Sequence, residues 1–421
     1  MVTLKIPYDD HSLDLHIDEQ NLRATIQLPV EQKPEKSARE LVLAALQNPV
    51  GTPSLRNLAV GKRKVVIVTS DHTRAVPSKI TLPILLSEIR AGNPQADITI
   101  LIATGAHRAT TGAEQRAMFG DEIVDHEHIV VNDAFRPEEF KYICDLPSGA
   151  HFSVNKLAAE CDLLIAEGFV EPHFFAGFSG GRKSILPGVC DIRTIKENHS
   201  YMQIASPYAT AGVTENNPVH RDMNFAARKV NLQFILNVTM NAQKEVTGAF
   251  AGDMILAHEQ AIEYVREVSA CERVVGDIVV TSNGGYPLDQ NLYQSPKVVA
   301  TAEACCRDGG VIIMCCGCRD GMGGDDFARL ISMGTPQEID DYLSKIPADQ
   351  TIPQQWCVQK IVKTLLNHKI ILVTDGLSVE EVTKANMQLA KTPDEALRMA
   401  YDMVGADAGV VVIPDGVVVL V

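Results

Sequence analysis

The stretch EPHFFAGFSGGRKSILPG, residues 171–188, places ionisable side chains around a glycine-rich turn. His173 precedes the turn, Arg182 and Lys183 end it, and His199 follows a short way downstream. A neighbouring arginine lowers the pKa of a lysine by like-charge repulsion, and a less protonated lysine is a better nucleophile. The pattern therefore suits a covalent adduct at Lys183, the alternative being a glycine turn with two solvated cations.

The same turn departs from a P-loop in two ways. Arg182 stands where the pattern G-x-x-x-x-G-K-[ST] requires its second glycine, and the turn begins several residues after the preceding apolar run instead of directly after it. A triphosphate cradle is therefore disfavoured. The backbone N–H groups of residues 179–181 can still form an anion-binding nest.

Polar side chains also follow other short apolar runs. VVIVTSD leads into Asp71 and Arg74, ILIATG leads into His107, and IVVTSNGG leads toward DQNLYQSPK. Ligands of open parallel sheets bind beyond the carboxyl ends of the strands, so these side chains are candidates for one site. A single histidine at such a position can equally be a surface or structural residue. Because His107 and His173 both adjoin glycine-rich turns, we predict that these two have a function.

The remaining histidines and cysteines carry weaker signals. Cys315, Cys316 and Cys318 stand together at a strand end, but no second C-x-x-C lies nearby, so buried thiols are favoured over a zinc site. His199 can supply one imidazole to a metal but cannot hold a metal alone. The histidines assigned to surface or structural positions are His11, His16, His126, His128, His151 and His368.

The elements that must position these residues alternate between strands and helices. Runs such as ITILIATG and GVVVIPDG are rich in β-branched residues and do not alternate, which is typical of strands buried on both faces, and helical patterns such as residues 259–270 and 393–405 lie between them. This order predicts two α/β domains with mostly parallel sheets flanking a central cleft. A break near residues 266–276 divides them into residues 1–270 and 271–421.

Composition excludes several functional classes. The net charge of −15 disfavours nucleic acid, and no apolar run is long enough for a membrane span. The first residues, MVTLKIPYDDHSLDLHID, predict strands and no signal peptide. Ten cysteines without a spacing framework indicate reduced thiols, as in the cytoplasm.

The motifs SDHTR, ATGAHR, EPHFFAGFSGGRKSILPG, ENHS, AGDM, NGGYPLDQNLYQSPK and IPDG closely resemble the nickel-dependent lactate racemases over nearly the whole chain. The resemblance implies a nickel-pincer nucleotide, a pyridinium-3,5-bisthiocarboxylic acid mononucleotide that binds nickel through two sulfurs and a ring carbon. Lys183 corresponds to the lysine tethered to it through a thioamide, and His199 to the fourth nickel ligand. Such soft donors explain why one protein imidazole suffices.

The resemblance also assigns roles to the other candidates. His107 and His173 correspond to the paired acid/base groups. The N-terminal domain would thus carry the cofactor and these groups, and the C-terminal domain the substrate-binding residues. The residues that correspond to the cofactor-contacting loop are Asp71, His72, Thr73 and Arg74. The residues that correspond to the substrate-binding set are Tyr293, Gln294 and Lys297, with Arg74. The implied partners are a small 2-hydroxy acid and the enzymes that make and deliver the cofactor.

Racemisation by this family's chemistry avoids a carbanion. Removing Cα–H as a proton beside a carboxylate, across a pKa gap on the order of 20 units to an imidazole, costs ~27 kcal/mol. A turnover near ~10 per second tolerates a barrier of about 16 kcal/mol. The expected reaction is therefore proton-coupled hydride transfer to the cofactor through a planar 2-keto acid, interconverting D- and L-lactate.

Three alternatives stay open. The same chemistry can act on malate, another 2-hydroxy acid or a sugar, and a second acidic group would call for an extra cation such as Arg108. A phosphotransferase would use the glycine-rich turn. A cofactor carrier without catalysis would bind the nickel group and leave the enantiomers unchanged.

Overall fold

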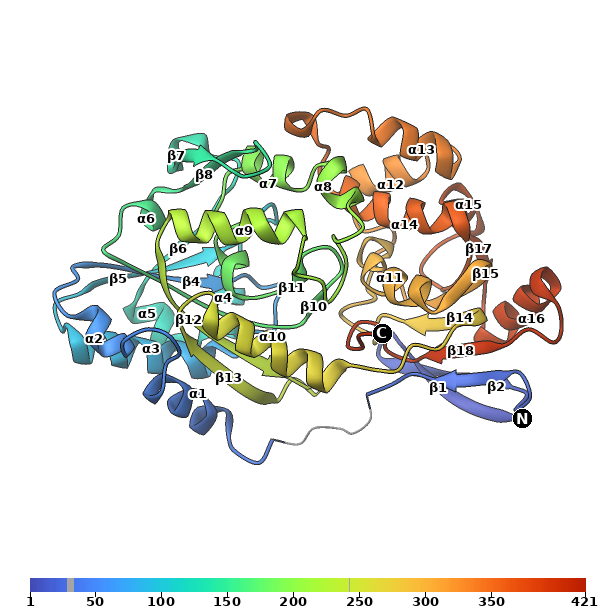
Figure 1. Ribbon diagram of the computed structural model, residues 1–421, viewed down its shortest axis with the longest axis horizontal. Helices are drawn as coiled ribbons and strands as arrows, with labels where there is room; N and C mark the ends of the chain where they lie inside the picture. The colour runs from blue at the N-terminus through green and yellow to red at the C-terminus, as the bar shows by residue number, and fades with distance from the viewer. Residues whose placement is uncertain (29–33, 242) are drawn as a thin grey trace.

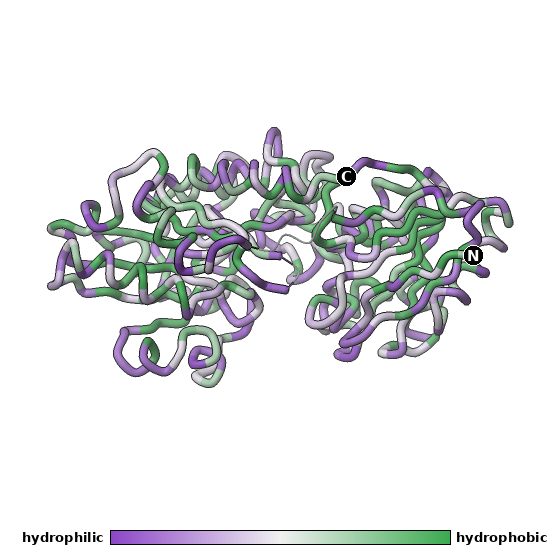
Figure 2. Tube along the Cα trace, turned by 90° about the horizontal axis from the view of Figure 1, so that it is seen from below, coloured by the Kyte–Doolittle hydropathy of each residue, from purple (hydrophilic) through white to green (hydrophobic). Residues whose placement is uncertain are grey.

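The computed structural model describes residues 1–28, 34–241 and 243–421. Figure 1 shows two α/β lobes side by side along the long axis, and each is built on one six-stranded sheet. Hydrophobic stretches run through the middle of each lobe, and polar ones lie along the outer loops (Figure 2). Among the described residues, no helix has the length and apolar character needed to cross a bilayer.

The first sheet has the strand order β13-β12-β9-β4-β5-β6, and only its edge strand β13 runs antiparallel. Its strands are β4 (Lys64–Ser70), β5 (Asp97–Ala103), β6 (His128–Val131), β9 (Leu163–Phe169), β12 (Leu232–Met240) and β13 (Val246–Gly252). The middle of β4, residues 65–68, is buried on both faces, which explains its continuous apolar run.

Helices cover both faces of this sheet. One face packs against α1 (Ala38–Gln47), α2 (Leu55–Ala59), α3 (Ser78–Gly92), α4 (Gly112–Phe119) and α5 (Asp121–His126). The other packs against α9 (Pro218–Lys229) and the start of α10 (Leu256–Ser269), together with the shorter α6 (Lys156–Ala159), α7 (Ile192–Asn198) and α8 (Tyr201–Ala205). A small antiparallel pair, β7 (Phe140–Asp145) and β8 (His151–Asn155), lies at the periphery (Figure 1).

The second sheet has the order β17-β16-β15-β14-β18-β3 and is parallel throughout. Its strands are β3 (Leu22–Thr25), β14 (Gly276–Ser282), β15 (Cys306–Cys315), β16 (Lys369–Val373), β17 (Gln388–Ala390) and β18 (Val410–Ile413). One face is covered by α11 (Pro296–Ala304), α12 (Asp325–Ile331), α13 (Pro336–Leu343) and α14 (Gln355–Asn367), and α15 (Val379–Lys384) leads into β17. The fold confirms the predicted α/β architecture with mostly parallel sheets.

The first residues of the chain depart from the predicted division at residues 1–270. β1 (Val2–Tyr8) and β2 (His11–Ile17) form a hairpin that, with α16 (Pro393–Val404), covers the other face of the second sheet. β3 pairs in parallel with β18. These strands belong to the second lobe because their buried side chains, such as Leu15 and Ile17, complete its core. The chain enters the first lobe only after β3.

Candidate active site

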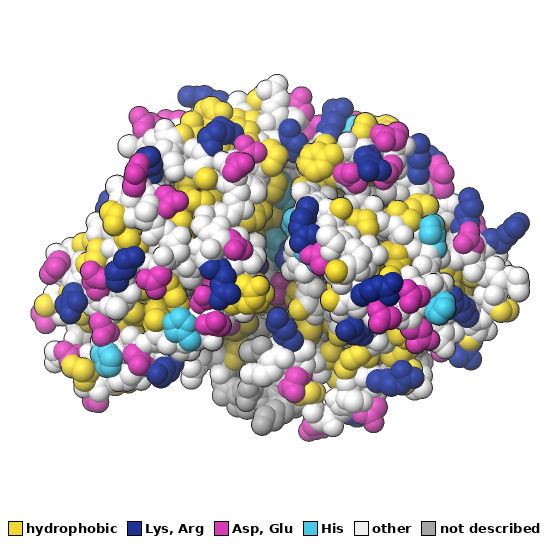
Figure 3. All heavy atoms as spheres, turned by 180° about the vertical axis from the view of Figure 1, so that it is seen from behind, with side chains coloured by type: hydrophobic (Ala, Val, Ile, Leu, Met, Phe, Trp, Pro, Cys, Tyr) yellow, Lys and Arg dark blue, Asp and Glu magenta, His cyan; other side chains and the backbone are white. Residues whose placement is uncertain are grey.

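The residues that follow the strand ends of both lobes come together in the middle of the molecule. Figure 3 shows a hollow between the lobes, with histidine and basic side chains visible inside it. Arg74, from the loop after β4, lies close enough to His173 and to Lys297 of the other lobe to lower the pKa of each, an effect that adds to burial. The hollow is therefore lined by both lobes.

Asp71 and His107 form a hydrogen-bonded pair at the ends of β4 and β5. Asp71 Oδ2 lies 2.7 Å from His107 Nδ1, and Asp71 Oδ1 accepts from the N–H and hydroxyl of Thr73 at 3.1 and 2.6 Å. Burial raises the pKa of Asp71, but the hydrogen bonds from His107 and Thr73, with the electrostatic effects of His107 and Arg74, outweigh burial, so this pKa falls below its ordinary value. An ionised Asp71 holds the proton on Nδ1 and leaves Nε2 to act toward the hollow.

The two other residues of this region turn away from that pair. His72 Nδ1 lies 3.2 Å from the hydroxyl of Thr110 and 4.0 Å from Glu114. Arg108 donates through both terminal nitrogens to the carboxylate of Glu114. Arg108 is therefore engaged on α4, which weakens its role as a cation for a second acidic group on the substrate.

His173 lies beside Lys183. β10 (Pro172–His173) pairs with β11 (Gly177–Phe178), so the chain folds back and brings the turn against the histidine. His173 Nδ1 accepts from the N–H of Ala176 at 3.3 Å, and His173 Nε2 lies 3.4 Å from Lys183 Nζ. Burial, then the charges of Lys183 and Arg74, lowers the pKa of His173 well below its ordinary value. The imidazole is accordingly neutral and able to accept a proton.

Arg182 is fully buried, so the alternative of a glycine turn with two solvated cations is wrong. Its guanidinium donates to the carbonyl oxygens of Ala176 at 2.8 Å and of Ser179 at 3.3 Å, and it lies 3.1 Å from His258 Nε2. Burial lowers the pKa of Arg182 to about 9. Gly181 adopts φ +51°, and a Cβ there would lie 2.9 Å from the ring of His258, so this position requires glycine.

The structure disfavours the anion-binding nest, because two of its three N–H donors are already used. The N–H of Ser179 donates to the carbonyl of Glu171 at 2.9 Å, and the N–H of Gly181 donates to Asn237 Oδ1 at 2.8 Å. Residues 181–184 form a single 3₁₀ turn, η2 (Gly181–Ser184), without the α-helix that follows a P-loop. The turn presents side chains, and not backbone amides, to a ligand.

Lys183 has the environment of a nucleophilic amine. Burial, reinforced by the charges of Arg182 and Arg74, lowers the pKa of Lys183 well below its ordinary value. Its Nζ lies 5.4 Å from the centre of the Phe175 ring, at the edge of the hollow. The sequence-based expectation of a less protonated lysine is thus supported, with desolvation as the larger cause.

His199 is buried between two aromatic rings and has one orphaned nitrogen. Its ring centre lies 5.0 Å from those of Phe175 and of Trp356, which comes from α14 in the other lobe. Nδ1 is buried without a hydrogen-bond partner, and burial followed by the charge of Lys183 lowers the pKa of His199 to about 3. A neutral imidazole with an unsatisfied nitrogen fits a metal ligand.

No protein-only metal site accompanies His199. In residues 1–28, 34–241 and 243–421, no group of three or more His, Cys, Asp or Glu side chains is arranged to hold an ion. Cys316 and Cys318 are buried with their sulfurs 3.4 Å apart, and Cys316 Sγ lies 3.3 Å from the carbonyl of Asp289. A metal at His199 would need donors from a cofactor.

The C-terminal lobe contributes Tyr293 and Gln294 in η3 (Leu292–Gln294) and Lys297 in the first turn of α11. Burial, then the charge of Arg74, lowers the pKa of Lys297 to about 8. Burial and the nearby Cys357 thiol raise the pKa of Tyr293 well above its ordinary value, so its hydroxyl stays protonated. These groups offer a cation and a hydrogen-bond donor to a substrate.

Two residues with contacts in the site received no role from the sequence. Glu171 is half-buried near Lys297, Arg74 and Lys183; burial raises its pKa and the three cations oppose that shift. In the sequence, the feature that could have pointed to Glu171 is its position in the segment EPH, two residues before His173. Trp356 touches His199 from a helix far away in sequence, so no local pattern could have revealed that contact.

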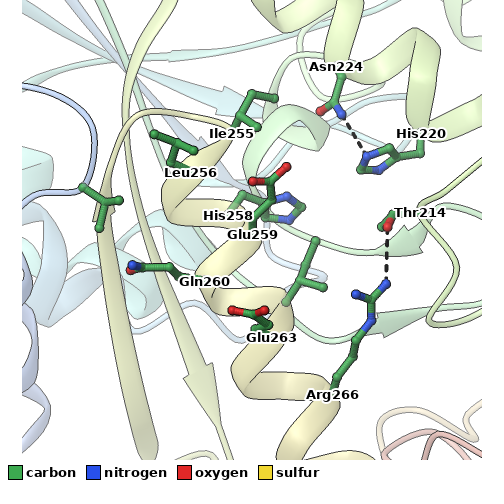
Figure 4. A pocket seen from close by; sticks show the side chains of 12 residues that line it. Thr214, His220, Asn224, Ile255, Leu256, His258, Glu259, Gln260, Glu263 and Arg266 are labelled. Atoms are coloured by element: carbon green, nitrogen blue, oxygen red, sulfur yellow. Dashed lines mark hydrogen bonds between the residues drawn. The ribbon is translucent and has the colours of Figure 1, made fainter.

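The best-formed separate cavity lies outside this site. It has a volume of about 420 Å³ and opens between α9 and α10 (Figure 4). His258 at its wall links the cavity to the turn, through its contacts with Ser179 and Arg182. None of the site residues expected from the sequence lines this cavity.

Comparison with known proteins identifies the same family over both lobes of the chain. Residues 8–212 match the family model "Lactate racemase N-terminal domain", and residues 271–421 match "Lactate racemase C-terminal domain". A lactate racemase from Thermoanaerobacterium thermosaccharolyticum is 48% identical, covering 100% of this chain and 99% of that protein. One from Lactiplantibacillus plantarum is 44% identical, with 100% of each chain covered.

Solved structures extend the comparison to the fold. The lactate racemase apoprotein from T. thermosaccharolyticum superposes with a TM-score of 0.97 at 47% identity, covering 100% of this chain and 99% of that one. A protein from Thermotoga maritima at 19% identity shares the fold, with a TM-score of 0.65 over 92% of this chain and 98% of that one.

Proposed function

Because this chain belongs to the lactate racemase family, we propose that it is an isomerase that interconverts D- and L-lactate through a 2-keto acid. The observation that carries the proposal is the convergence of Lys183, His173 and His199 in one hollow. There Lys183 Nζ lies 3.4 Å from His173 Nε2, and Lys183 is also close enough to His199 to lower the pKa of that imidazole further than burial alone does. These are the side chains that a tethered nickel cofactor and its acid/base chemistry require.

The residues fit the nickel-pincer nucleotide. Lys183 is the proposed tether and His199 the proposed nickel ligand, which its buried, unpartnered nitrogen supports. Asp71, His72, Thr73 and Arg74 are proposed to contact the nucleotide. When bound, the cofactor supplies an electron-poor ring able to take up hydride from the substrate carbon and return it. The burial that lowers the pKa of Lys183 also favours forming its covalent bond, because it makes the amine easier to deprotonate.

His107 and His173 handle the hydroxyl proton. One imidazole, in its neutral form, removes this proton as the substrate carbon is oxidised, and the other, starting in its protonated form, supplies a proton when the ketone is reduced from its opposite face. Two bases are needed because the hydroxyl occupies different positions in the two enantiomers. Asp71 orients His107 and stabilises the imidazolium formed there, whereas the buried setting of His173 holds that ring neutral before reaction.

Lys297 and Arg74 are proposed to anchor the substrate carboxylate, with Gln294 and Tyr293 as neutral hydrogen-bond partners. Two cations in a closed hollow bind a carboxylate through charge-assisted bonds. Glu171 offsets part of their charge in the free protein. Since Arg108 is engaged by Glu114, the structure favours a monocarboxylate such as lactate over malate.

The test uses protein produced together with the enzymes that make the cofactor. Intact mass and nickel content report the Lys183 adduct, and a D-specific lactate dehydrogenase reports conversion of L-lactate. We expect His107→Ala and His173→Ala to keep the adduct and the nickel but to stop conversion. Loading without conversion in the unaltered protein would instead identify a cofactor carrier. ATP-dependent activity surviving Lys183→Arg would indicate the phosphotransferase.

A further inference from the structure

Glu167 is a fully buried acid that the proposed reaction does not use. It lies on β9 in the alternating series Leu163, Ile165, Glu167, whose first two members face the apolar core against α3. Its side chain is 0% exposed and has no basic partner among the described residues. A lone buried carboxylate is costly unless hydrogen bonds satisfy it, so its surroundings indicate its purpose.

Three hydroxyl groups satisfy this carboxylate. Thr69 Oγ1 and Ser78 Oγ each donate to Glu167 Oε1 at 2.6 Å, and Thr81 Oγ1 donates to Oε2. The three donors are about 1% exposed, so water does not compete for these bonds. Burial raises the pKa of Glu167 above its ordinary value, and the three hydroxyl bonds offset only part of that shift.

These bonds join the two ends of one functional loop. Thr69 lies at the end of β4 and Ser78 is the first residue of α3, so both ends of the loop 71–77 are fixed to a single oxygen. α3 begins after Pro77 without a side-chain cap, and its first-turn side chains Ser78 and Thr81 bond to Glu167. We call Glu167, Thr69, Ser78 and Thr81 the hydroxyl clasp.

We propose that Glu167 is a positioning residue for catalysis: through the hydroxyl clasp it fixes the 71–77 loop so that Asp71 holds His107 in its working orientation. The effect on kcat rests on the proposed function, whereas the effect on the order of the loop does not. Within the loop, Asp71 accepts from the N–H groups of Thr73 and Arg74, through Oδ1 and the main-chain carbonyl respectively. These two amides therefore report the order of the loop without any turnover.

The first arm of the test measures hydrogen exchange in the cofactor-free protein. In Glu167→Gln, an amide group replaces a carboxylate that accepts from three hydroxyls, so the clasp loosens. We expect the Thr73 and Arg74 amides, followed in peptides covering residues 71–77, to exchange at least about 10-fold faster. Ile89→Val in the same helix is the control: it removes a buried methylene from α3 without touching the clasp, and loop exchange should stay unchanged.

The second arm is a double-mutant cycle on kcat in the nickel-loaded enzyme. If Glu167 acts through Asp71, then Glu167→Gln and Asp71→Asn each lower kcat by about 10- to 100-fold. The kcat of the double variant should then agree, within about 2-fold, with that of the less active single variant. Their effects on melting temperature should add. The proposal would be overturned if the loss of kcat in the double variant equalled the product of the two single losses. It would also be overturned if the amides of the 71–77 loop exchanged at an unchanged rate in Glu167→Gln.

A milder variant keeps the proposal testable if Glu167→Gln does not fold. Ser78→Ala removes one donor and leaves the carboxylate with Thr69 and Thr81, so we expect a smaller acceleration of Thr73 and Arg74 exchange, about 3-fold. No acceleration there would count against the clasp. Absence of racemase activity in the unaltered protein would refute the proposed function, and the exchange arm would still decide whether Glu167 orders the loop.

Discussion

The pair of Asp71 and His107 gives the sharpest prediction about catalysis. Asp71→Asn keeps the size of the side chain but removes its charge, 2.7 Å from His107 Nδ1. An amide can also donate to Nδ1, which places the imidazole proton on Nε2, the nitrogen that must act as the base. The substitution therefore removes the stabilisation of the imidazolium and permits the wrong tautomer.

The size of the effect follows from the type of bond. Asp71 is 2% exposed and the His107 side chain is 43% exposed, so their bond is partly shielded from water. A hydrogen bond to a charged group contributes about 1.5–3 kcal/mol. At about 1.36 kcal/mol per factor of ten, kcat/KM should fall by about 10- to 100-fold. Because the pKa of Asp71 is lowered, the carboxylate stays ionised and the loss should persist from about pH 5 to pH 9.

The assay follows conversion of L-lactate with a D-specific dehydrogenase, normalised to the nickel content. Asp394→Asn is the matched control, since Asp394 accepts from His16 at 2.8 Å in a similar pair on the surface of the other lobe. That variant should retain full activity. An Asp71→Asn enzyme with normal nickel content and undiminished kcat/KM would refute the role assigned to this pair.

Four further predictions concern loading and stability. His199→Ala should keep the mass of the Lys183 adduct while losing most nickel; nickel retained at wild-type stoichiometry would contradict the assignment. Lys183→Arg and Lys183→Ala should both lack the adduct by intact mass, whereas the phosphotransferase alternative expects the arginine variant to work. Leu15→Ala should lower the free energy of unfolding by about 2–5 kcal/mol in urea, because this fully buried side chain completes the second core; a neutral result would place the hairpin outside it. Burial raises the pKa of Asp415 to about 6, above its value in the unfolded chain, so ionisation of this group destabilises the folded protein as the pH rises from about 4 to 6. In Asp415→Asn, the melting temperature should therefore fall less with pH over that interval. An unchanged slope of melting temperature against pH would contradict this role of Asp415.

The local sequence was sufficient for the architecture, and it indicated which side chains to consider as candidates for the site. Continuous β-branched runs separated by helical patterns require a parallel sheet covered on both faces, and the polar residues after those runs must lie at one sheet edge. That reasoning brings His107 and His173 toward one site before any coordinates are known. The long motifs supplied the family and, with it, the roles of Lys183 and His199, which spacing alone left open.

Other features depend on contacts between distant parts of the chain. The hairpin and β3 join the second lobe because their apolar faces fit its open surface, a match that no local pattern encodes. Arg182 looks like a solvated cation in sequence, yet the fold buries it against the carbonyl of Ala176 and His258 of α10.

Glu167 illustrates the same limit most clearly. In sequence it is one charge at the end of an apolar run, and its three hydroxyl partners lie 86 to 98 residues away. The sequence by itself determined which elements form and which chemical groups stand at their ends, since both follow from local pattern. Only the tertiary structure decided which groups are stripped of water and paired, because desolvation and hydrogen bonding depend on neighbours that the chain brings together from afar.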